Sequence, residues 1–111
     1  MKTVKIIIVA ILAIVISSNV YSQSVTTKTE TIKVSGNCDM CKARIEKAAK
    51  IDGVSKAEWN KKEKTLIATF DLAKINIDEI GKKVAAAGHD NEKVKADDKV
   101  YDKLPGCCKY R

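Results

Sequence analysis

Two cysteines three positions apart carry the sharpest chemical signal in the sequence. Cys38 and Cys41 follow an alternating apolar segment and lie where a helical pattern begins. The start of a helix offers unpaired backbone N–H groups and a positive partial charge, which favour thiolate over thiol. Thiolates bind soft ions such as Cu(I), Zn(II) and heavier thiophilic metals. The spacing predicts a metal-binding pair, with a thioredoxin-like redox pair and a structural disulfide as alternatives.

Two adjacent cysteines near the C-terminus, Cys107 and Cys108, form a second group. They follow Pro105 and Gly106, where a bend would let the tail fold back. The tail could then donate one or both thiolates to the first pair and close the site towards four ligands. It could instead hold a second, weaker metal or pass one onward. Disulfides with the first pair or between chains are the third alternative, and four cysteines permit three pairings.

Two other side chains are weaker candidates for the metal site. His89 is the only histidine and follows a glycine that ends a predicted helix. It could be a third ligand or a hydrogen-bond donor to a cysteine sulfur, or an exposed loop residue without a role. Asp39 could add an oxygen ligand, which would shift preference towards Zn(II) or Cd(II), or could accept N–H groups as a helix cap.

Basic residues gather on the helix that follows the first cysteine pair. Lys42, Arg44, Lys47 and Lys50 lie close to the predicted metal loop. They would offset the charge of a dithiolate and could dock onto an acidic partner domain. A solvated helix face is the simpler interpretation.

The N-terminus has the charge and hydropathy order of an export signal. Residues 1–5 include two lysines, residues 6–16 are apolar without interruption, and small residues lead to Ser22. An apolar run of this length is short of the roughly 17–25 residues that a spanning helix needs. We therefore expect cleavage after Ser22 and a periplasmic or secreted protein, with a retained membrane anchor as the alternative.

Size and composition narrow the function further. A chain of 111 residues fits one domain with a modest core, which argues against a large enzyme with a deep pocket. The formal net charge is +7, but acidic residues are interspersed with the lysines and aromatic residues make up only 5%. Neither a nucleic-acid surface nor a base-stacking platform is therefore expected.

Apolar periodicity predicts the elements that must position these side chains. Strands are expected over 30–34, through Ala57 and Trp59, and over 66–70, with a weak charged strand near 93–96. Helices are expected over 40–51 and, capped by Asn76, through Ala87. The order β-α-β-β-α-β predicts an α+β, ferredoxin-like fold with a four-stranded antiparallel sheet and two helices on one face. Trp59 and Phe70 are expected in the core.

The sequence resembles the heavy-metal-associated (HMA) domain family over about residues 29–96. The resemblance rests on residues 32–41, 51–54, 65–71 and 85–90. It implies a ferredoxin-like fold, a soft metal on Cys38 and Cys41, and transfer to a partner with a similar domain. The family has Gly-Met-x-Cys before its first ligand, whereas here Gly36 is one residue closer and Met40 lies between the cysteines.

The sequence therefore predicts a signal peptide (1–22), a flexible lead (23–28), an HMA-like domain (29–96) and a cysteine-containing extension (97–111). The expected function is extracytoplasmic binding, transfer or sequestration of a soft ion, with Cu(I) first, Hg(II) second and Zn(II) or Cd(II) after them. No enzymatic activity is expected. An exported thiol–disulfide oxidoreductase and a disulfide-stapled interaction domain are the alternatives.

The expected partner is a metal-transporting or metal-accepting protein with a similar domain. Nucleic acid is not expected as a partner, and neither is a membrane once the signal peptide has been cleaved. A homodimer bridged by metal on Cys38 and Cys41 is a further option.

Overall fold

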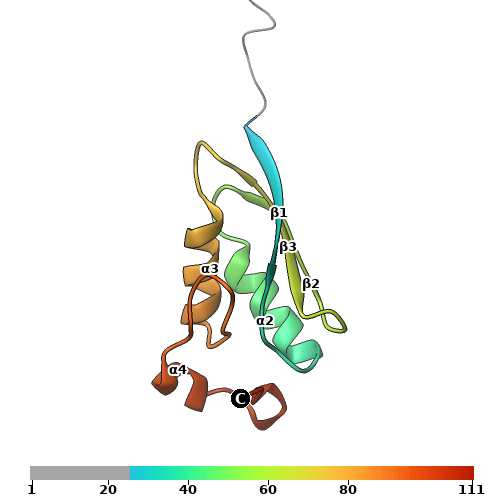
Figure 1. Ribbon diagram of the computed structural model, residues 1–111, viewed down its shortest axis with the longest axis vertical. Helices are drawn as coiled ribbons and strands as arrows, with labels where there is room; N and C mark the ends of the chain where they lie inside the picture. Colours follow the sequence, from blue (N-terminus) through green and yellow to red (C-terminus); the bar gives the residue numbers. More distant parts are fainter. Residues whose placement is uncertain (1–25) are drawn as a thin grey trace, which may run out of the picture.

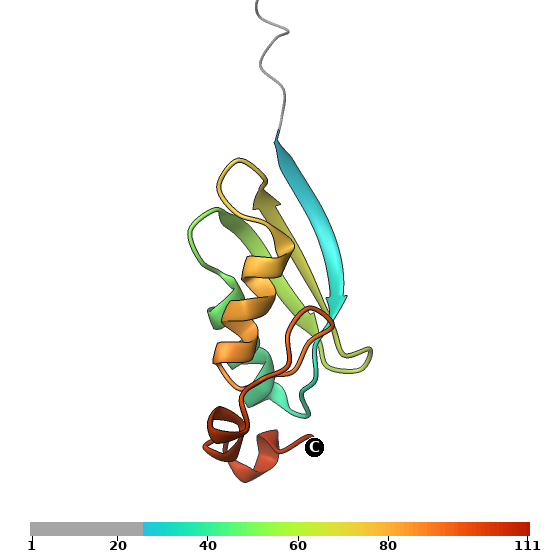
Figure 2. The same ribbon diagram turned by 60° about the vertical axis from the view of Figure 1, so that its left-hand side comes forward.

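The computed structural model describes residues 26–111. The expected signal segment and the first half of the expected lead, residues 23–25, lie outside these residues. Within them, three strands form one antiparallel sheet in the order β1-β3-β2, and helices α2 and α3 cover one of its faces (Figures 1 and 2). The elements are β1 (Thr27–Lys33), α2 (Asp39–Ala49), β2 (Val54–Asn60), β3 (Thr65–Asp71), α3 (Ile77–Ala86), α4 (Asp98–Asp102) and the 3-10 turn η2 (Gly106–Cys108).

Alternation along the strands places the core between sheet and helices. In β3, Leu66, Ala68 and Phe70 are buried while Ile67 between them is exposed. Trp59 of β2 lies opposite Leu66 and is 1% exposed. The helices contribute apolar stripes to the same core, through residues including Ile45, Ile80 and Val84. The predicted core positions of Trp59 and Phe70 are confirmed.

The ends of the helices follow the signals in the sequence. The side chain of Asn76 accepts a 2.9 Å hydrogen bond from the backbone N–H of Glu79 and caps α3, as predicted. Gly53 follows α2 with a φ of 94°, and Gly88 follows α3 with a φ of 106°. Both conformations favour glycine because L side chains rarely adopt them. Strand β1 begins at Thr27, inside the segment that we expected to be flexible, and Thr27 pairs with Asp71.

The predicted fourth strand near 93–96 is wrong. The sheet formed by the described residues has three strands, and only one isolated bridge, between Val34 and Asn91, stands at the place of the fourth. The side-chain oxygen of Asn91 accepts hydrogen bonds from the backbone N–H groups of Lys93 and Val94. This local turn curls the chain away from the edge of β1, because it uses the donors that a ladder would need.

After this turn the chain runs to the end of the molecule where α2 begins, and α4 and η2 cover that end (Figures 1 and 2). The Tyr110 hydroxyl donates to the carbonyl of Gly88 at 2.6 Å and accepts from the backbone N–H of Asp90 at 2.7 Å. The guanidinium of Arg111 pairs with Asp90 at 2.9 Å and Asp98 at 2.7 Å. The contacts with Gly88 and Asp90 fix the tail to the turn after α3, and the pair with Asp98 ties Arg111 to α4.

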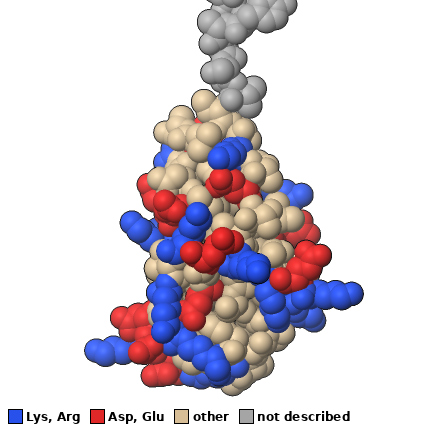
Figure 3. All heavy atoms as spheres, viewed as in Figure 1, with Lys and Arg blue, Asp and Glu red and all other residues tan. Residues whose placement is uncertain are grey.

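Lys and Arg side chains are interspersed with Asp and Glu over the face shown in Figure 3. Among the described residues, every helix is too short or too polar to cross a membrane.

Candidate metal centre

The first cysteine pair sits at the junction of a loop and a helix. Cys38 is the N-cap of α2 and has extended backbone angles, and Cys41 lies in the first turn with no exposed surface. Their sulfurs are 3.3 Å apart. The sequence-based placement of this pair at a helix N-terminus is therefore correct.

The loop before Cys38 is packed tightly against β2 and the turn that follows it. The indole Nε1 of Trp59 donates to the carbonyl of Val34 at 3.0 Å, and the Lys64 ammonium donates to the carbonyl of Gly36 at 2.6 Å. A Cβ on Gly36 would come within 3.0 Å of the Trp59 ring and 3.2 Å of the Cβ of Cys41. A side chain at this position would force the Trp59 ring or Cys41 to shift, so the loop that presents the cysteines packs closely against both.

The tail brings both of its cysteines to the first pair. The Sγ of Cys38 lies 3.5 Å from that of Cys107 and 3.5 Å from that of Cys108. The sulfurs of Cys38, Cys41 and Cys108 all lie within 4.8 Å of one another. A tetrahedral thiolate site with metal–sulfur bonds of about 2.3 Å has sulfur–sulfur edges of about 3.8 Å. The cluster is thus close to the size that one metal ion requires.

The four sulfurs differ in exposure, and all four are free thiols. Cys41 and Cys108 are fully buried, Cys38 is intermediate and Cys107 is exposed. The cluster is therefore closed on the side of the protein core and open on the side of Cys107.

A hydrogen bond between residues adjacent to Cys38 and Cys108 joins the loop to the tail. The side-chain amide of Asn37 donates to the carbonyl of Lys109 at 2.9 Å. The Lys109 ammonium in turn donates to the carbonyls of Tyr101 at 3.1 Å and Asp102 at 2.7 Å. The first bond joins the neighbour of Cys38 to the neighbour of Cys108, and the other two hold Lys109 within the tail, so these contacts help to set the separation of the two cysteine pairs.

Arg44 of α2 reaches the buried tail sulfur. Its guanidinium Nη1 donates to the Sγ of Cys108 at 3.2 Å. Burial raises the pKa of Cys108, and the hydrogen bond from Arg44 acts in the opposite direction. A fixed positive charge here compensates the negative charge that gathers when the thiols ionise.

The thiols also differ in their readiness to ionise. The backbone N–H of Cys41, with smaller help from the other cysteines, lowers the pKa of Cys38 to about 6. Burial raises the pKa of Cys41 to about 11. Donation of the Cys107 S–H to Cys38, together with desolvation, raises the pKa of Cys107. One thiolate is therefore available at neutral pH, and the other thiols must lose a proton to bind a metal.

His89 is fully buried beside this region rather than exposed in a loop. Its Nδ1 lies 2.8 Å from the carbonyl of Ser35, its ring stacks on Tyr110 and its Nε2 has no hydrogen-bond partner. Burial lowers the pKa of the imidazole. It is not among the side chains whose ligand atoms converge, and its role as a ligand stays a prediction.

The other charged candidates have ordinary partners. The N-cap of α2 is Cys38, not Asp39, and the Asp39 carboxylate is exposed and pairs with Lys61 at 3.2 Å. Lys42 bonds to Glu46 at 2.9 Å and to the carbonyl of Trp59 at 3.0 Å. Of the basic helix residues, Lys42 and Arg44 therefore serve the fold and the site, and sequence reasoning missed the contact of Arg44 because it depends on the tail.

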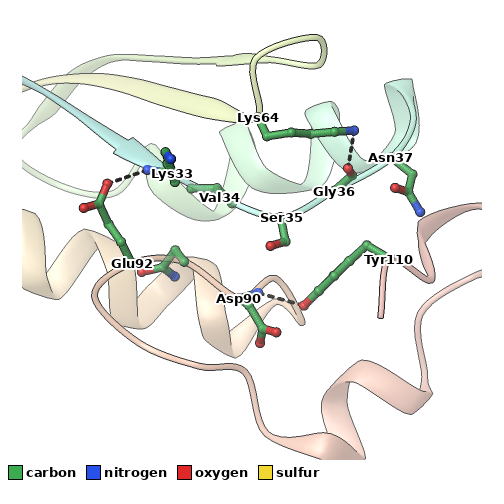
Figure 4. A pocket seen from close by; sticks show the side chains of 10 residues that line it. Lys33, Val34, Ser35, Gly36, Asn37, Lys64, Asp90, Glu92 and Tyr110 are labelled. Atoms are coloured by element: carbon green, nitrogen blue, oxygen red, sulfur yellow. Dashed lines mark hydrogen bonds between the residues drawn. The ribbon is translucent and has the colours of Figure 1, made fainter.

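A pocket of about 400 Å³ lies next to the cysteine loop (Figure 4). It is lined by the loop 34–37, by residues 90–92 and by Tyr110, whose hydroxyl points to the backbone of Asp90 (Figure 4). None of the four cysteines lines it. The pocket is therefore separate from the sulfur cluster.

A known protein is similar to this chain in sequence. The mercuric transport protein periplasmic component of Pseudomonas fluorescens is 35% identical over 65 residues, which cover 57% of this chain and 71% of that protein. This chain belongs to the heavy-metal-associated domain family. No protein-family model matches the sequence, so membership rests on relatives of this kind.

Solved structures of HMA proteins have the same fold as this chain. The CopZ metallochaperone has a TM-score of 0.56 and 27% identity, covering 58% of this chain and 98% of its own. The water-soluble region of the P-type ATPase CopA from Bacillus subtilis has a TM-score of 0.57 and 31% identity, covering 62% of this chain and 47% of its own. The predicted α+β class of the HMA fold is thus confirmed, apart from the fourth strand.

Proposed function

We propose that this HMA protein binds a soft metal ion outside the cytoplasm and holds it in a site closed by its own C-terminal tail. Cys38 and Cys41 are the primary ligands, Cys108 is the third and Cys107 is the fourth on the open side. The observation that carries the proposal is the convergence of Cys38, Cys41 and Cys108 within 4.8 Å.

Chemistry favours a thiophilic cation as the cargo. Three or four thiolates, with two of the sulfurs buried and a guanidinium alongside, suit Cu(I) first and Hg(II) second. Zn(II) and Cd(II) also accept four thiolates. No bond to carbon, oxygen or phosphorus is made or broken in this function, so the protein acts as a binder and not as an enzyme.

The tail favours retention over rapid exchange. In a two-cysteine site the open coordination positions let thiolates of a partner enter. Here Cys108 and Cys107 stand where such thiolates would enter, within 3.5 Å of Cys38. Transfer to a metal-transporting or metal-accepting protein with a similar domain then proceeds from the side of Cys107, by stepwise exchange of thiolates.

The extracytoplasmic location rests on the N-terminal sequence and on the periplasmic relative. Intact-mass analysis of the protein recovered from a bacterial periplasm tests it. Loss of residues 1–22 supports export, and a full-length chain retained in the cytoplasm or membrane contradicts it.

The function itself is tested by anaerobic titration of the protein with Cu(I), Hg(II) and Zn(II), with free thiols counted at each point. We expect one tightly bound ion per chain with protection of at least three thiols. The double variant Cys38→Ser/Cys41→Ser should lose binding. Full thiol reactivity in the presence of each metal would contradict the proposal.

A thiol–disulfide oxidoreductase is the second candidate, and the low pKa of Cys38 favours it because a thiolate is the attacking group in disulfide exchange. The test is reduction of insulin disulfides by the reduced protein. Activity that disappears in Cys38→Ser supports the enzyme, and no turnover removes it. A disulfide-stapled domain would instead show all four cysteines paired when it is isolated anaerobically from its native compartment.

A further inference from the structure

A fifth sulfur lies at the open side of the cluster. The thioether of Met40 is 3.7 Å from the Sγ of Cys107. Met40 is the second residue of α2 and is 54% exposed, which is unusual for so apolar a side chain. It is one of two methionines in the chain, and the other is Met1.

The sulfurs form a continuous series from the surface to the core. Met40 and Cys107 are exposed, Cys38 is intermediate, and Cys41 and Cys108 are fully buried. Successive separations are 3.7 Å from Met40 to Cys107, 3.5 Å from Cys107 to Cys38, and 3.3 Å from Cys38 to Cys41. An ion can therefore exchange one sulfur for the next without leaving sulfur coordination.

We propose that Met40 and Cys107, with Cys38 as a shared ligand, form an outer site that captures Cu(I) before it moves to the buried thiolates. This inference rests on the proposed metal-binding function and adds to it an outer site that is selective for Cu(I). The copper remains monovalent throughout. Each thiol that binds releases one proton to water, and each step inward replaces one copper–sulfur bond with another.

The thioether of Met40 makes this outer site prefer Cu(I) over Zn(II). Thiolate and thioether sulfurs are soft donors that select Cu(I), whereas Zn(II) takes thiolate, imidazole and carboxylate ligands. A neutral thioether also releases its ion more readily than a thiolate does. Met40 should therefore act on Cu(I) and be indifferent to Zn(II).

The Met40 methyl group provides a direct test by NMR. In protein labelled with ¹³C at the methionine methyl groups, Met40→Leu assigns the Met40 signal, and Met1 adds a second signal only while residues 1–22 are retained. We expect Cu(I) added below one equivalent to shift the Met40 signal. Zn(II) bound by the same cysteines should leave it near its metal-free position. Cys107→Ser should reduce the Cu(I) shift.

Capture rates supply the second measurement, with Cu(I) presented as a weak chromogenic chelate. Met40→Leu conserves volume, and we expect it to slow Cu(I) uptake by about tenfold while the equilibrium affinity changes by less than about threefold. Leu72→Met is the matched control, because Leu72 is also exposed, at 52%, and lies outside the cysteine cluster. It should not alter uptake.

Three outcomes separate the two proposals. Tight Cu(I) binding with an unmoved Met40 signal and an unchanged uptake rate overturns the outer site and leaves the cysteine site intact. An equal shift with Zn(II) and Cu(I) also overturns it, because the signal would then report only proximity. A protein that binds neither metal overturns both.

Discussion

The guanidinium of Arg44 lies 3.2 Å from the sulfur of Cys108, so that a helix residue and a tail residue far apart in sequence share one contact. This contact joins the helix that carries the first cysteine pair to the segment that carries the second. It places a permanent positive charge against a buried sulfur, where a thiolate would otherwise be costly.

Replacing Arg44 with leucine should weaken metal binding while the fold persists, because leucine removes the charge and the hydrogen bond without adding a sulfur ligand. A hydrogen bond with a charged partner contributes about 1.5–3 kcal/mol, so we expect at least about a tenfold loss of Cu(I) affinity. Competition with a Cu(I) chelator measures it. Lys47→Leu is the control, because Lys47 is an exposed cation on the same helix. Equal losses in both variants would mean that Arg44 acts only through overall charge.

The tail prediction concerns residues 103–111. Their deletion should lower metal affinity by at least about tenfold and speed transfer to an acceptor chelate, because Cys107 and Cys108 leave the site. The double variant Cys107→Ser/Cys108→Ser keeps the anchors at Tyr110 and Arg111 and should show the same loss. Unchanged affinity in the double variant would show that the tail supplies no ligand.

Proton release should count the ligands. At pH 7 Cys38, with a pKa of about 6, is mostly ionised, whereas Cys41, with a pKa of about 11, is protonated. The raised pKa values of Cys107 and Cys108 keep these thiols protonated as well. A site of Cys38 and Cys41 alone therefore releases about one proton, addition of Cys108 makes it about two, and addition of Cys107 about three.

Affinity should accordingly rise with pH. Because protons compete with the metal, the logarithm of the apparent binding constant should increase by about two to three per pH unit between about pH 7 and 9. Calorimetric titrations in buffers of different ionisation enthalpy measure the number of protons directly. A value of one or less at pH 7 is incompatible with tail ligands.

Gly36→Ala should disturb the site through packing alone. The added methyl group would meet the Trp59 ring at 3.0 Å, and such overpacking typically costs about 1–3 kcal/mol. We expect a lower free energy of unfolding in urea and weaker metal binding. Gly106→Ala is the matched control, because a Cβ there meets nothing within 4 Å although the residue adjoins Cys107. Similar destabilisation of both variants would contradict the packing argument.

The sequence predicted those features that depend on local signals. The first cysteine pair, the Asn76 cap and the alternation through Leu66 and Phe70 are each encoded within a few residues. The prediction of a fourth strand was wrong because the charged residues near 93–96 gave only a weak strand pattern. In the structure, the side chain of Asn91 forms a turn with the residues that follow it. Propensity is a weak guide where a side chain can compete for backbone donors.

The sequence alone could not decide between the alternative roles of the tail cysteines. The return of Cys107 and Cys108 was one of three open alternatives, since nothing local to residues 105–108 indicates what they contact. Contacts of Tyr110 and Arg111 hold the tail against the domain in the structure, and no sequence pattern indicated them. The burial of His89 was likewise hidden, because the tail covers it through Tyr110.

X-ray absorption spectroscopy of the protein with one equivalent of Cu(I) tests the central claim most directly, because it counts the sulfur atoms around the ion. The closed site predicts three or more sulfurs in wild type and two in Cys107→Ser/Cys108→Ser. Two sulfurs in wild type, with no change in the double variant, would contradict the account and leave an open site made of Cys38 and Cys41 alone.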